Sequence, residues 1–117
     1  MSNPFIYAEL HSENPAAAKT FYGQLFSWRL ADAPKSDGRY TEIAPGEGFP
    51  AGLTKSQNGG SHWLTYIKVD DLAASTEKAK RLGARAVKEL QEIPGEGRFS
   101  VLVDPTGATF GLWEKAA

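Results

Sequence analysis

The 117-residue sequence predicts an α+β fold built from two βαβββ modules. Three observations support this fold class. A strand-like segment followed by a helix-capping signal occurs twice, each predicted helix is followed by three strand-like segments, and a strong turn signal joins the last two strands. We therefore expect one domain over residues 1–117, made of repeats at about 4–57 and 61–115, with a Gly-rich linker at 58–61.

The first module should begin with a strand over residues 5–11, which are mostly aromatic and aliphatic. Asn14 can cap the next helix and Pro15 fits its first turn, so the helix should run from Pro15 to about Phe26. Residue spacing predicts a buried stripe on that helix, with Lys19 and Gln24 facing water. The stripe comprises Ala18, Phe21, Tyr22 and Leu25. Three strands should follow, at about 28–31, 38–44 and 49–55.

The second module repeats these signals with an offset of 57 residues, which places Asn14 on Asp71. A strand over 63–69 should lead into a helix that starts near Leu72 and ends at Gly83, a residue that readily adopts the left-handed conformation. Strands should follow at 85–90, 97–103 and 109–114. Asp104-Pro105-Thr106-Gly107 should join the last two strands as a hairpin.

Composition excludes several classes of function. The chain has 13 Lys and Arg residues against 14 Asp and Glu residues, with no basic cluster, so we expect no nucleic-acid partner. It has no Cys, which excludes disulfides, thiolate nucleophiles and cysteine-based metal centres. No apolar run approaches the length of a membrane span and the N-terminal residues lack a signal-peptide pattern, which predicts a cytoplasmic protein without membrane contact.

Two segments carry a resemblance to a known family. A-A-A-K-T-F-Y-G-Q-L-F-S-W at 16–28 and V-L-V-D-P-T-G-A-T-F-G-L-W at 101–113 resemble the vicinal oxygen chelate superfamily, which includes glyoxalase I, extradiol dioxygenases and bleomycin-resistance proteins. The resemblance covers nearly the whole chain. It implies that two βαβββ modules form a curved mixed sheet around a cavity. In metal-dependent members, His and Glu ligands come from the first and last strands of each module.

Transferring those ligand positions residue by residue gives no metal centre, because the positions fall on Tyr7, Gly52, Leu64 and Gly111. The resemblance therefore implies the metal-independent, ligand-binding branch typified by bleomycin-resistance proteins, with no cofactor. The alternative is an enzyme, either a glyoxalase I-like lyase or a dioxygenase, that binds a divalent metal through displaced ligands such as Glu9 and His11. A third possibility is a dimeric interaction module without a small ligand.

Strand alternation indicates which side chains share a face with these positions. Glu9 and His11 should share the face of Tyr7, and Tyr66 and Lys68 the face of Leu64. In residues 98–103, Phe99, Val101 and Val103 should pack under a helix, leaving Arg98, Ser100 and Leu102 on the other side. We expect His62 to be exposed and Trp28 and Trp63 to be structural. The candidate ligand-binding residues are Tyr7, Glu9, Tyr66, Lys68, Arg98 and Trp113.

We expect Tyr7, Glu9, Tyr66, Arg98 and Trp113 to line one cavity that takes a small molecule, since such pockets combine aromatic walls with a few polar groups. Arg98 or Lys68 should hold the Glu9 carboxylate when no ligand is bound, because a carboxylate facing a cavity needs a partner. We also expect a homodimer, because two modules with curved sheets would otherwise leave apolar surface exposed.

Overall fold

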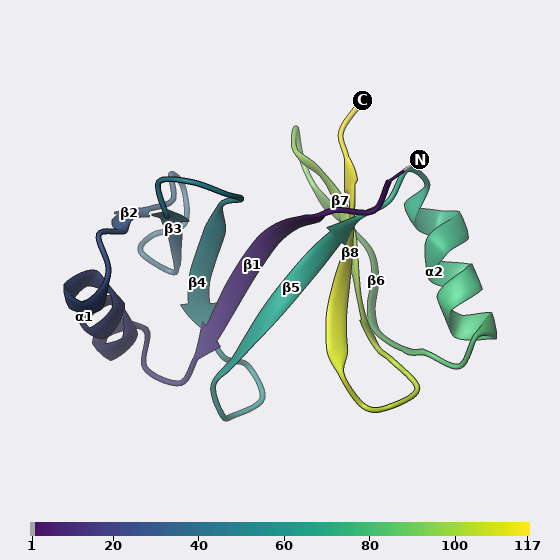
Figure 1. Cartoon of the computed structure of the whole chain (residues 1–117), viewed down its shortest axis with the longest axis horizontal. Helices are drawn as coiled ribbons and strands as arrows, with labels where there is room; N and C mark the ends of the chain where they lie inside the picture. The colour runs from purple at the N-terminus through teal and green to yellow at the C-terminus, as the bar shows by residue number, and fades with distance from the viewer. Residues whose placement is uncertain (1) are drawn as a thin grey trace. The chain divides into compact units, whose positions relative to one another are not determined.

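The computed structural model describes residues 2–117 and confirms the α+β class, with the order βαβββ occurring twice (Figure 1). The chain divides into two compact units. One contains residues 7–64, and the other contains residues 65–117 together with the N-terminal residues up to Ile6. No helix within the described residues is long and apolar enough to cross a membrane.

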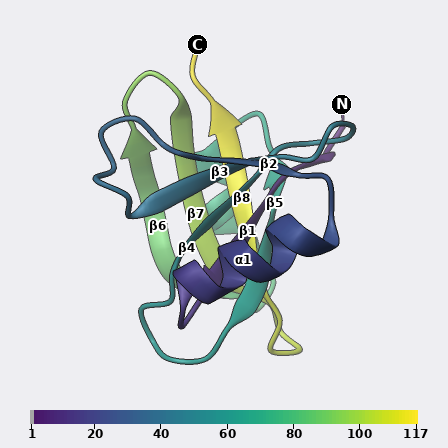
Figure 2. The ribbon, with the colours of Figure 1, turned by 90° about the vertical axis from the view of Figure 1, so that its left-hand side faces the viewer.

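The first module forms a four-stranded mixed sheet in the order β2-β3-β4-β1. β1 runs parallel to β4, whereas β3 is antiparallel to both β2 and β4. Figure 2 shows α1 lying across one face of this sheet. The bounds are β1 Phe5–Ser12, α1 Pro15–Leu25, β2 Arg29–Asp32, β3 Tyr40–Ala44 and β4 Ala51–Lys55.

The core of this module confirms half of the predicted helix stripe. Ala18 and Tyr22 of α1 pack against the cluster of Leu10, Ile43, Ala51 and Leu53. The prediction that Phe21 and Leu25 are buried is wrong, because 58% and 57% of their surfaces are exposed. In a helix, adjacent residues are turned by about 100°, so the row of Phe21 and Leu25 lies beside the row that faces the sheet. Residue spacing identified both rows but not which one is covered.

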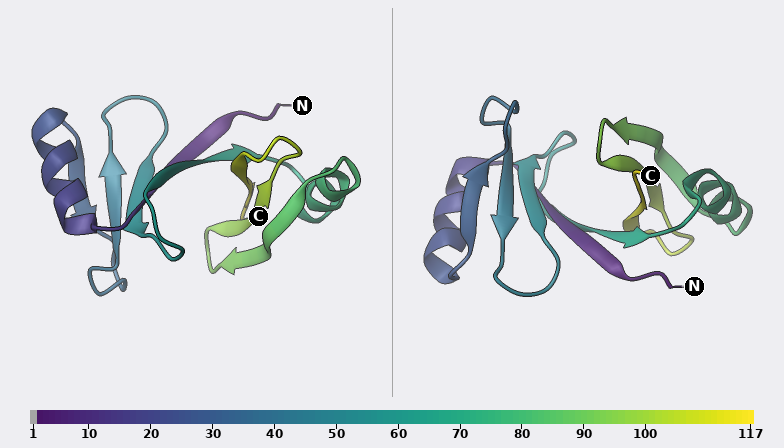
Figure 3. Two further views of the ribbon diagram at one scale, coloured as in Figure 1. Left: turned by 90° about the horizontal axis from the view of Figure 1, so that it is seen from below. Right: turned by 90° about the horizontal axis from the view of Figure 1, so that it is seen from above.

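The second module has the same topology. β5 runs parallel to β8, and β8, β7 and β6 are antiparallel, in the order β5-β8-β7-β6. α2 packs on one face of β6, β7 and β8, as both views of Figure 3 show. The bounds are β5 His62–Lys68, α2 Leu72–Arg81, β6 Arg85–Ile93, β7 Gly97–Val103 and β8 Thr109–Lys115.

Packing under α2 overturns the predicted orientation of β7. Leu102 is fully buried in a cluster with Leu72 of α2, and the hydroxyl groups of Ser100 and Thr76 are 2.9 Å apart. Arg98, Ser100 and Leu102 therefore lie on the helix side, whereas Phe99 lies on the opposite face. Strand alternation correctly grouped these residues. It could not indicate which group the helix covers, because both groups contain large apolar side chains.

Local signals at the element ends are confirmed. Asn14 Oδ1 accepts a hydrogen bond from the backbone N–H of Ala17 at 3.1 Å, and Asp71 Oδ1 accepts one from Ala74 at 3.0 Å. Gly83 follows α2 with φ of 108°, which favours glycine. Asp104 Oδ1 accepts two backbone N–H bonds in the turn between β7 and β8. These contacts are local in sequence, so the sequence could predict them.

Candidate functional site

A hydrogen-bonded cluster lies on the face of the first module's sheet opposite α1. The Tyr40 hydroxyl, on β3, donates to Glu9 Oε2 at 2.7 Å and is also hydrogen-bonded to the Tyr7 hydroxyl. His11 Nε2 lies 2.8 Å from Glu9 Oε1. The neighbours of these residues on β1, Ala8 and Leu10, belong to the core on the helix side. Alternation along β1 therefore places Tyr7, Glu9 and His11 together, as the sequence predicted.

Gly52 on β4 makes room for this cluster. In the strand register it lies directly opposite Glu9 of β1 and Glu42 of β3. A Cβ atom added at Gly52 would fall on the hydroxyl oxygens of Tyr40 and Tyr7. The two tyrosines therefore occupy the space that any larger residue would fill. The glycine is needed here for close approach rather than for an unusual backbone angle.

The cluster has a definite direction of proton donation. Burial raises the pKa of Tyr40 far above its ordinary value, and the negative charge of Glu9 raises it further. Tyr40 therefore stays protonated and gives its proton to Glu9. Since that proton is committed, the Tyr7 hydroxyl is the donor in its bond with Tyr40. Glu9 ends this chain as the acceptor, with a bond to each carboxylate oxygen.

His62 extends the cluster from the start of β5. It is exposed, as predicted, but its ring stacks on His11 with the centroids 5.0 Å apart and the planes 2° from parallel. Glu13 holds the linker before it: the backbone N–H of Glu13 donates to Ser61 Oγ at 3.1 Å, and the N–H of Gly60 donates to Glu13 Oε1 at 3.0 Å. These bonds fix the backbone immediately before His62.

The corresponding face of the second module is aromatic. Tyr66 corresponds to Glu9 by the 57-residue offset, and it lies opposite Gly111 just as Glu9 lies opposite Gly52. A Cβ atom at Gly111 would fall on the Tyr66 ring. The Phe99 ring meets the Tyr66 ring edge-on with the ring centroids 5.9 Å apart, and it stacks on the Trp113 ring with the centroids 6.4 Å apart. The same sheet positions thus carry a polar cluster in one module and stacked rings in the other.

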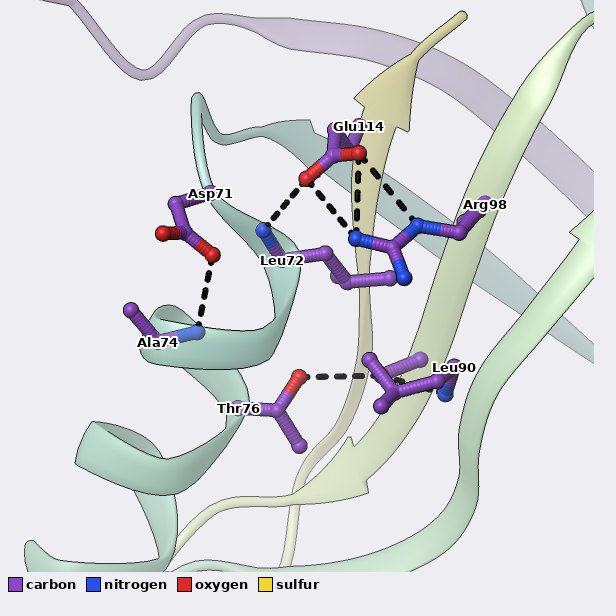
Figure 4. Close-up of polar contacts among 8 residues, drawn as sticks. Asp71, Leu72, Ala74, Thr76, Leu90, Arg98 and Glu114 are labelled. Carbon is purple, nitrogen blue, oxygen red and sulfur yellow. Dashed lines mark hydrogen bonds and ion pairs between the residues drawn. The ribbon is translucent and has the colours of Figure 1, made fainter.

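Arg98 does not share the face of Tyr66 and Trp113, so that part of the predicted pocket is wrong. Its guanidinium group pairs with Glu114 at 3.1 Å, on the side of α2 (Figure 4). Glu114 Oε1 also accepts the backbone N–H of Leu72 at 2.8 Å. The bond from Leu72 and the bonds from Arg98 hold the pKa of Glu114 below its ordinary value. This pair caps α2 at the edge of a depression of about 630 Å3.

The remaining predicted residues have mixed outcomes. The described partners of the Glu9 carboxylate are Tyr40 and His11, whereas Arg98 is bound to Glu114. Lys68 is half-buried and lies opposite Trp113 in the register. Whether Tyr7, Glu9, Tyr66, Lys68 and Trp113 contact one ligand stays a prediction. Trp28 and Trp63 pack with Tyr22, consistent with a structural role.

Sequence reasoning missed Tyr40, the central donor of the cluster. Its strand was predicted, but nothing in the sequence linked that strand to Glu9, which lies 31 positions earlier. The available signal was Gly52, because a glycine within a strand indicates a close approach by another group. Even so, the identity of that group depends on the register of β3 and β4, which places Tyr40 opposite Thr54, two residues beyond Gly52.

The residues at the family's ligand positions do not fit a His/Glu metal centre. In the first module, Gly52 has no side chain and the tyrosine hydroxyls fill the space above it. In the second module, Gly111 is covered by Tyr66, and at the first-strand position the hydrocarbon side chain of Leu64 is buried. Within residues 2–117, no group of three or more His, Asp or Glu side chains is placed to hold a metal ion.

Comparisons with known proteins agree with this architecture. A putative glyoxylase of Mycobacterium tuberculosis, CFP32, is 33% identical over 121 residues, covering 92% of this chain and 44% of its own length. The anthracycline biosynthesis protein DnrV of Streptomyces peucetius is 28% identical over 124 residues, covering 92% of this chain and 45% of that protein. The chain thus spans less than half the length of the curated relatives it matches.

Solved structures share the fold at low sequence identity. Methylmalonyl-CoA epimerase from M. tuberculosis superposes with a TM-score of 0.70 and 18% identity, covering 97% of this chain and 88% of the epimerase. A Mn(II)-bound glyoxalase from Novosphingobium aromaticivorans has a TM-score of 0.68 and 14% identity, covering 97% of this chain and 40% of that one. The model of the glyoxalase-like domain family matches residues 8–113. The chain therefore belongs to the glyoxalase-like domain family, as the resemblance in its sequence implied.

Proposed function

We propose that this chain binds a small organic molecule on the sheet face opposite α1, and that Tyr7, Glu9 and His11 orient it. The observation that carries the proposal is the chain of hydrogen bonds from Tyr7 through Tyr40 to Glu9, in a family whose members bind small-molecule substrates. A half-buried carboxylate and imidazole on a sheet face are unusual for purely structural positions. They supply the few oriented polar groups that small-molecule sites use.

We further propose that binding is independent of metal, as in bleomycin-resistance-type proteins. Gly52 and Gly111 supply no donor atoms, and tyrosine side chains fill the space beside each. Elemental analysis after purification without added metal and dialysis is the test. We expect no stoichiometric Ni, Zn, Fe or Mn. One equivalent that survives dialysis would contradict metal independence and favour a metal-dependent lyase or dioxygenase.

Ligand binding is tested by native mass spectrometry of the freshly purified chain, followed by thermal-shift screening of aromatic and carbonyl compounds. Tyr40→Phe removes one hydroxyl without changing the ring, and Glu47→Gln, in the exposed turn after β3, is the matched control. We expect the phenylalanine variant to bind a retained or screened ligand at least about tenfold more weakly, since a lost charge-assisted hydrogen bond leaves the Glu9 carboxylate short of a donor. Equal affinity in the two variants would contradict the proposed site.

The aromatic face of the second module is a separate candidate surface for a planar ligand. Two relatives carry anthracycline biosynthesis in their names, so an anthracycline is a suitable aromatic probe. If the probe stacks on Trp113, then Trp113→Ala should weaken its binding about tenfold, because stacking on an aromatic ring is worth about 0.5–1.5 kcal/mol beyond the area it covers. Unchanged affinity would exclude Trp113 as a binding residue.

We also propose that the chain forms a homodimer through α1. Three large apolar side chains are exposed on or just after this helix: Phe21, Leu25 and Phe26. The one charged residue of the helix is Lys19, whose Nζ lies 3.6 Å from Asp32 Oδ1. α2, at the equivalent place in the second module, instead presents Glu77, Lys78 and Arg81 to water. A helix face that is apolar and nearly uncharged can meet a copy of itself without charge repulsion.

The cytoplasmic location stays a prediction from the sequence.

A further inference from the structure

We propose that His11 is a general base whose Nδ1 takes a proton from the bound molecule, with Glu9 and Tyr40 as positioning residues. The proposal rests on the proposed binding site for the approach of a ligand. It goes further by assigning a reaction step, proton abstraction, and by naming the class of ligand, a molecule that carries an acidic O–H or C–H proton.

The bond to Glu9 determines which nitrogen of His11 holds the proton. Glu9 Oε1 lies 2.8 Å from His11 Nε2, and a carboxylate oxygen can only accept. In the neutral ring the proton therefore lies on Nε2, and the lone pair lies on Nδ1. A histidine oriented by a carboxylate through one nitrogen while the other acts as the base is a recurring catalytic arrangement.

The carboxylate is itself held in place. Tyr40 donates to Oε2 at 2.7 Å while His11 donates to Oε1, so rotation of the carboxylate would break two hydrogen bonds. Tyr7 in turn donates to Tyr40. The protons of Tyr7, Tyr40 and His11 Nε2 are all committed within the cluster. Nδ1 of His11 is then the atom that can accept a proton. The cluster therefore favours a ligand that donates a hydrogen bond or a proton.

The His11 ring is partly exposed to an incoming molecule. Among residues 2–117, no fully buried side-chain nitrogen or oxygen lacks a hydrogen-bond partner. The described hydrogen bond of His11 is formed through Nε2, and 22% of the side chain is exposed, so an incoming molecule can reach the ring. The stacked ring of His62 covers one face of His11 and limits its rotation. The base is therefore accessible and oriented at once.

The proposed step balances without a co-reactant. The electron pair of Nδ1 forms a bond to the proton of the ligand, and the bonding pair left behind makes the ligand an anion. The resulting imidazolium keeps its Nε2–H bond to the Glu9 carboxylate, which stabilises the positive charge. Return of the proton to the same or another atom of the ligand restores neutral His11.

The first test is spectroscopic and needs no ligand. The chain has two histidines, so long-range proton–nitrogen NMR of the 15N-labelled protein resolves both rings, and His62→Asn assigns them. At a pH where the rings are neutral, we expect the His11 proton on Nε2. We expect Glu9→Gln to give a mixture of tautomers, because an amide can donate as well as accept. A proton on Nδ1 in the wild type, or an unchanged tautomer ratio in Glu9→Gln, would overturn the proposal.

The second test uses 5-nitrobenzisoxazole, a small carbon acid. A base removes its ring C–H proton, that electron pair completes a nitrile, and the N–O bond breaks to release a coloured phenolate. We expect His11→Asn to lower the rate constant at least about tenfold, since a positioned base contributes about 10²–10⁴-fold on its own substrate. Glu9→Gln should give an intermediate rate and Glu47→Gln the wild-type rate.

An equal rate in His11→Asn and wild type would overturn the base assignment.

The two proposals fail in distinguishable ways. If Tyr40→Phe weakens the binding of a retained ligand while His11→Asn leaves the rate of the probe reaction unchanged, the binding site stands and His11 is not a base. If His11 drives the probe reaction while Tyr40→Phe leaves ligand binding unchanged, the base stands and the proposed binding site does not.

Discussion

Tyr40 and Gly52 are complementary: the hydroxyl group of Tyr40 occupies the space where a Cβ atom of residue 52 would lie. This contact brings β3 into the same hydrogen-bonded cluster as β1, because the hydroxyl in that space reaches Glu9. The second module uses the same device with different chemistry, since Tyr66 covers Gly111. Each module thus places a tyrosine over the glycine at which the sequence resemblance would put a metal ligand.

Gly52→Ala should therefore destabilise the chain. The new methyl group would overlap the hydroxyls of Tyr40 and Tyr7, and overpacking of this kind costs about 1–3 kcal/mol. Urea unfolding of both proteins measures the difference. Gly23→Ala is the matched control, because its Cβ would meet Leu30 at an ordinary 3.6 Å and alanine favours the helix. A neutral Gly52→Ala variant would contradict the close packing described here.

The buried pair of Thr76 and Ser100 should behave as a coupled unit. Their hydroxyls are 2.9 Å apart, and Ser100 Oγ also accepts the backbone N–H of Leu90 at 3.1 Å. Thr76→Val leaves the Ser100 hydroxyl without its partner on α2, which should cost about 1–3 kcal/mol. In a double-mutant cycle with Ser100→Ala, the combined loss should be smaller than the sum of the single losses. Strict additivity would show that the two hydroxyls do not interact.

Stability should depend on Glu114 in acid. Its native pKa is below the ordinary Glu value, so the ionised form stabilises the fold above the unfolded-state pKa, and this contribution is lost as the pH falls through the native pKa. Glu114→Gln should be less stable than wild type near neutral pH, and the gap should close as the pH falls below about 4.5. Urea unfolding across that range measures it, with Glu47→Gln as the control. A gap that persists at the lowest pH would contradict this assignment.

Association should depend on the exposed face of α1. Light scattering at micromolar concentration should give twice the chain mass of 12.7 kDa for the wild type. Leu25→Lys places an unpaired charge in the proposed interface and should give a monomer. Lys78→Glu on the solvated face of α2 should remain a dimer. A wild-type mass near 12.7 kDa would exclude the homodimer, and a dimeric Leu25→Lys variant would place the interface elsewhere.

The sequence by itself determined the order and type of the elements. Asn14 and Asp71 cap the two helices, and Asp104 organises the last turn, through contacts that span four residues or fewer. Such signals can be read locally because the interacting atoms are neighbours in the chain. Alternation along β1 likewise determined that Tyr7, Glu9 and His11 share a face, since the side-chain period of a strand is two.

Only the tertiary structure decided which of the possible faces is covered. α1 turns Tyr22 rather than Phe21 toward its sheet, and α2 covers Leu102 rather than Phe99. The partners of Glu9 were decided in the same way, because Tyr40 reaches it through the register of β3, β4 and β1. Periodicity defines the faces of an element. The choice between two apolar faces depends on how all the neighbouring elements pack against it, and no local segment of the sequence contains that information.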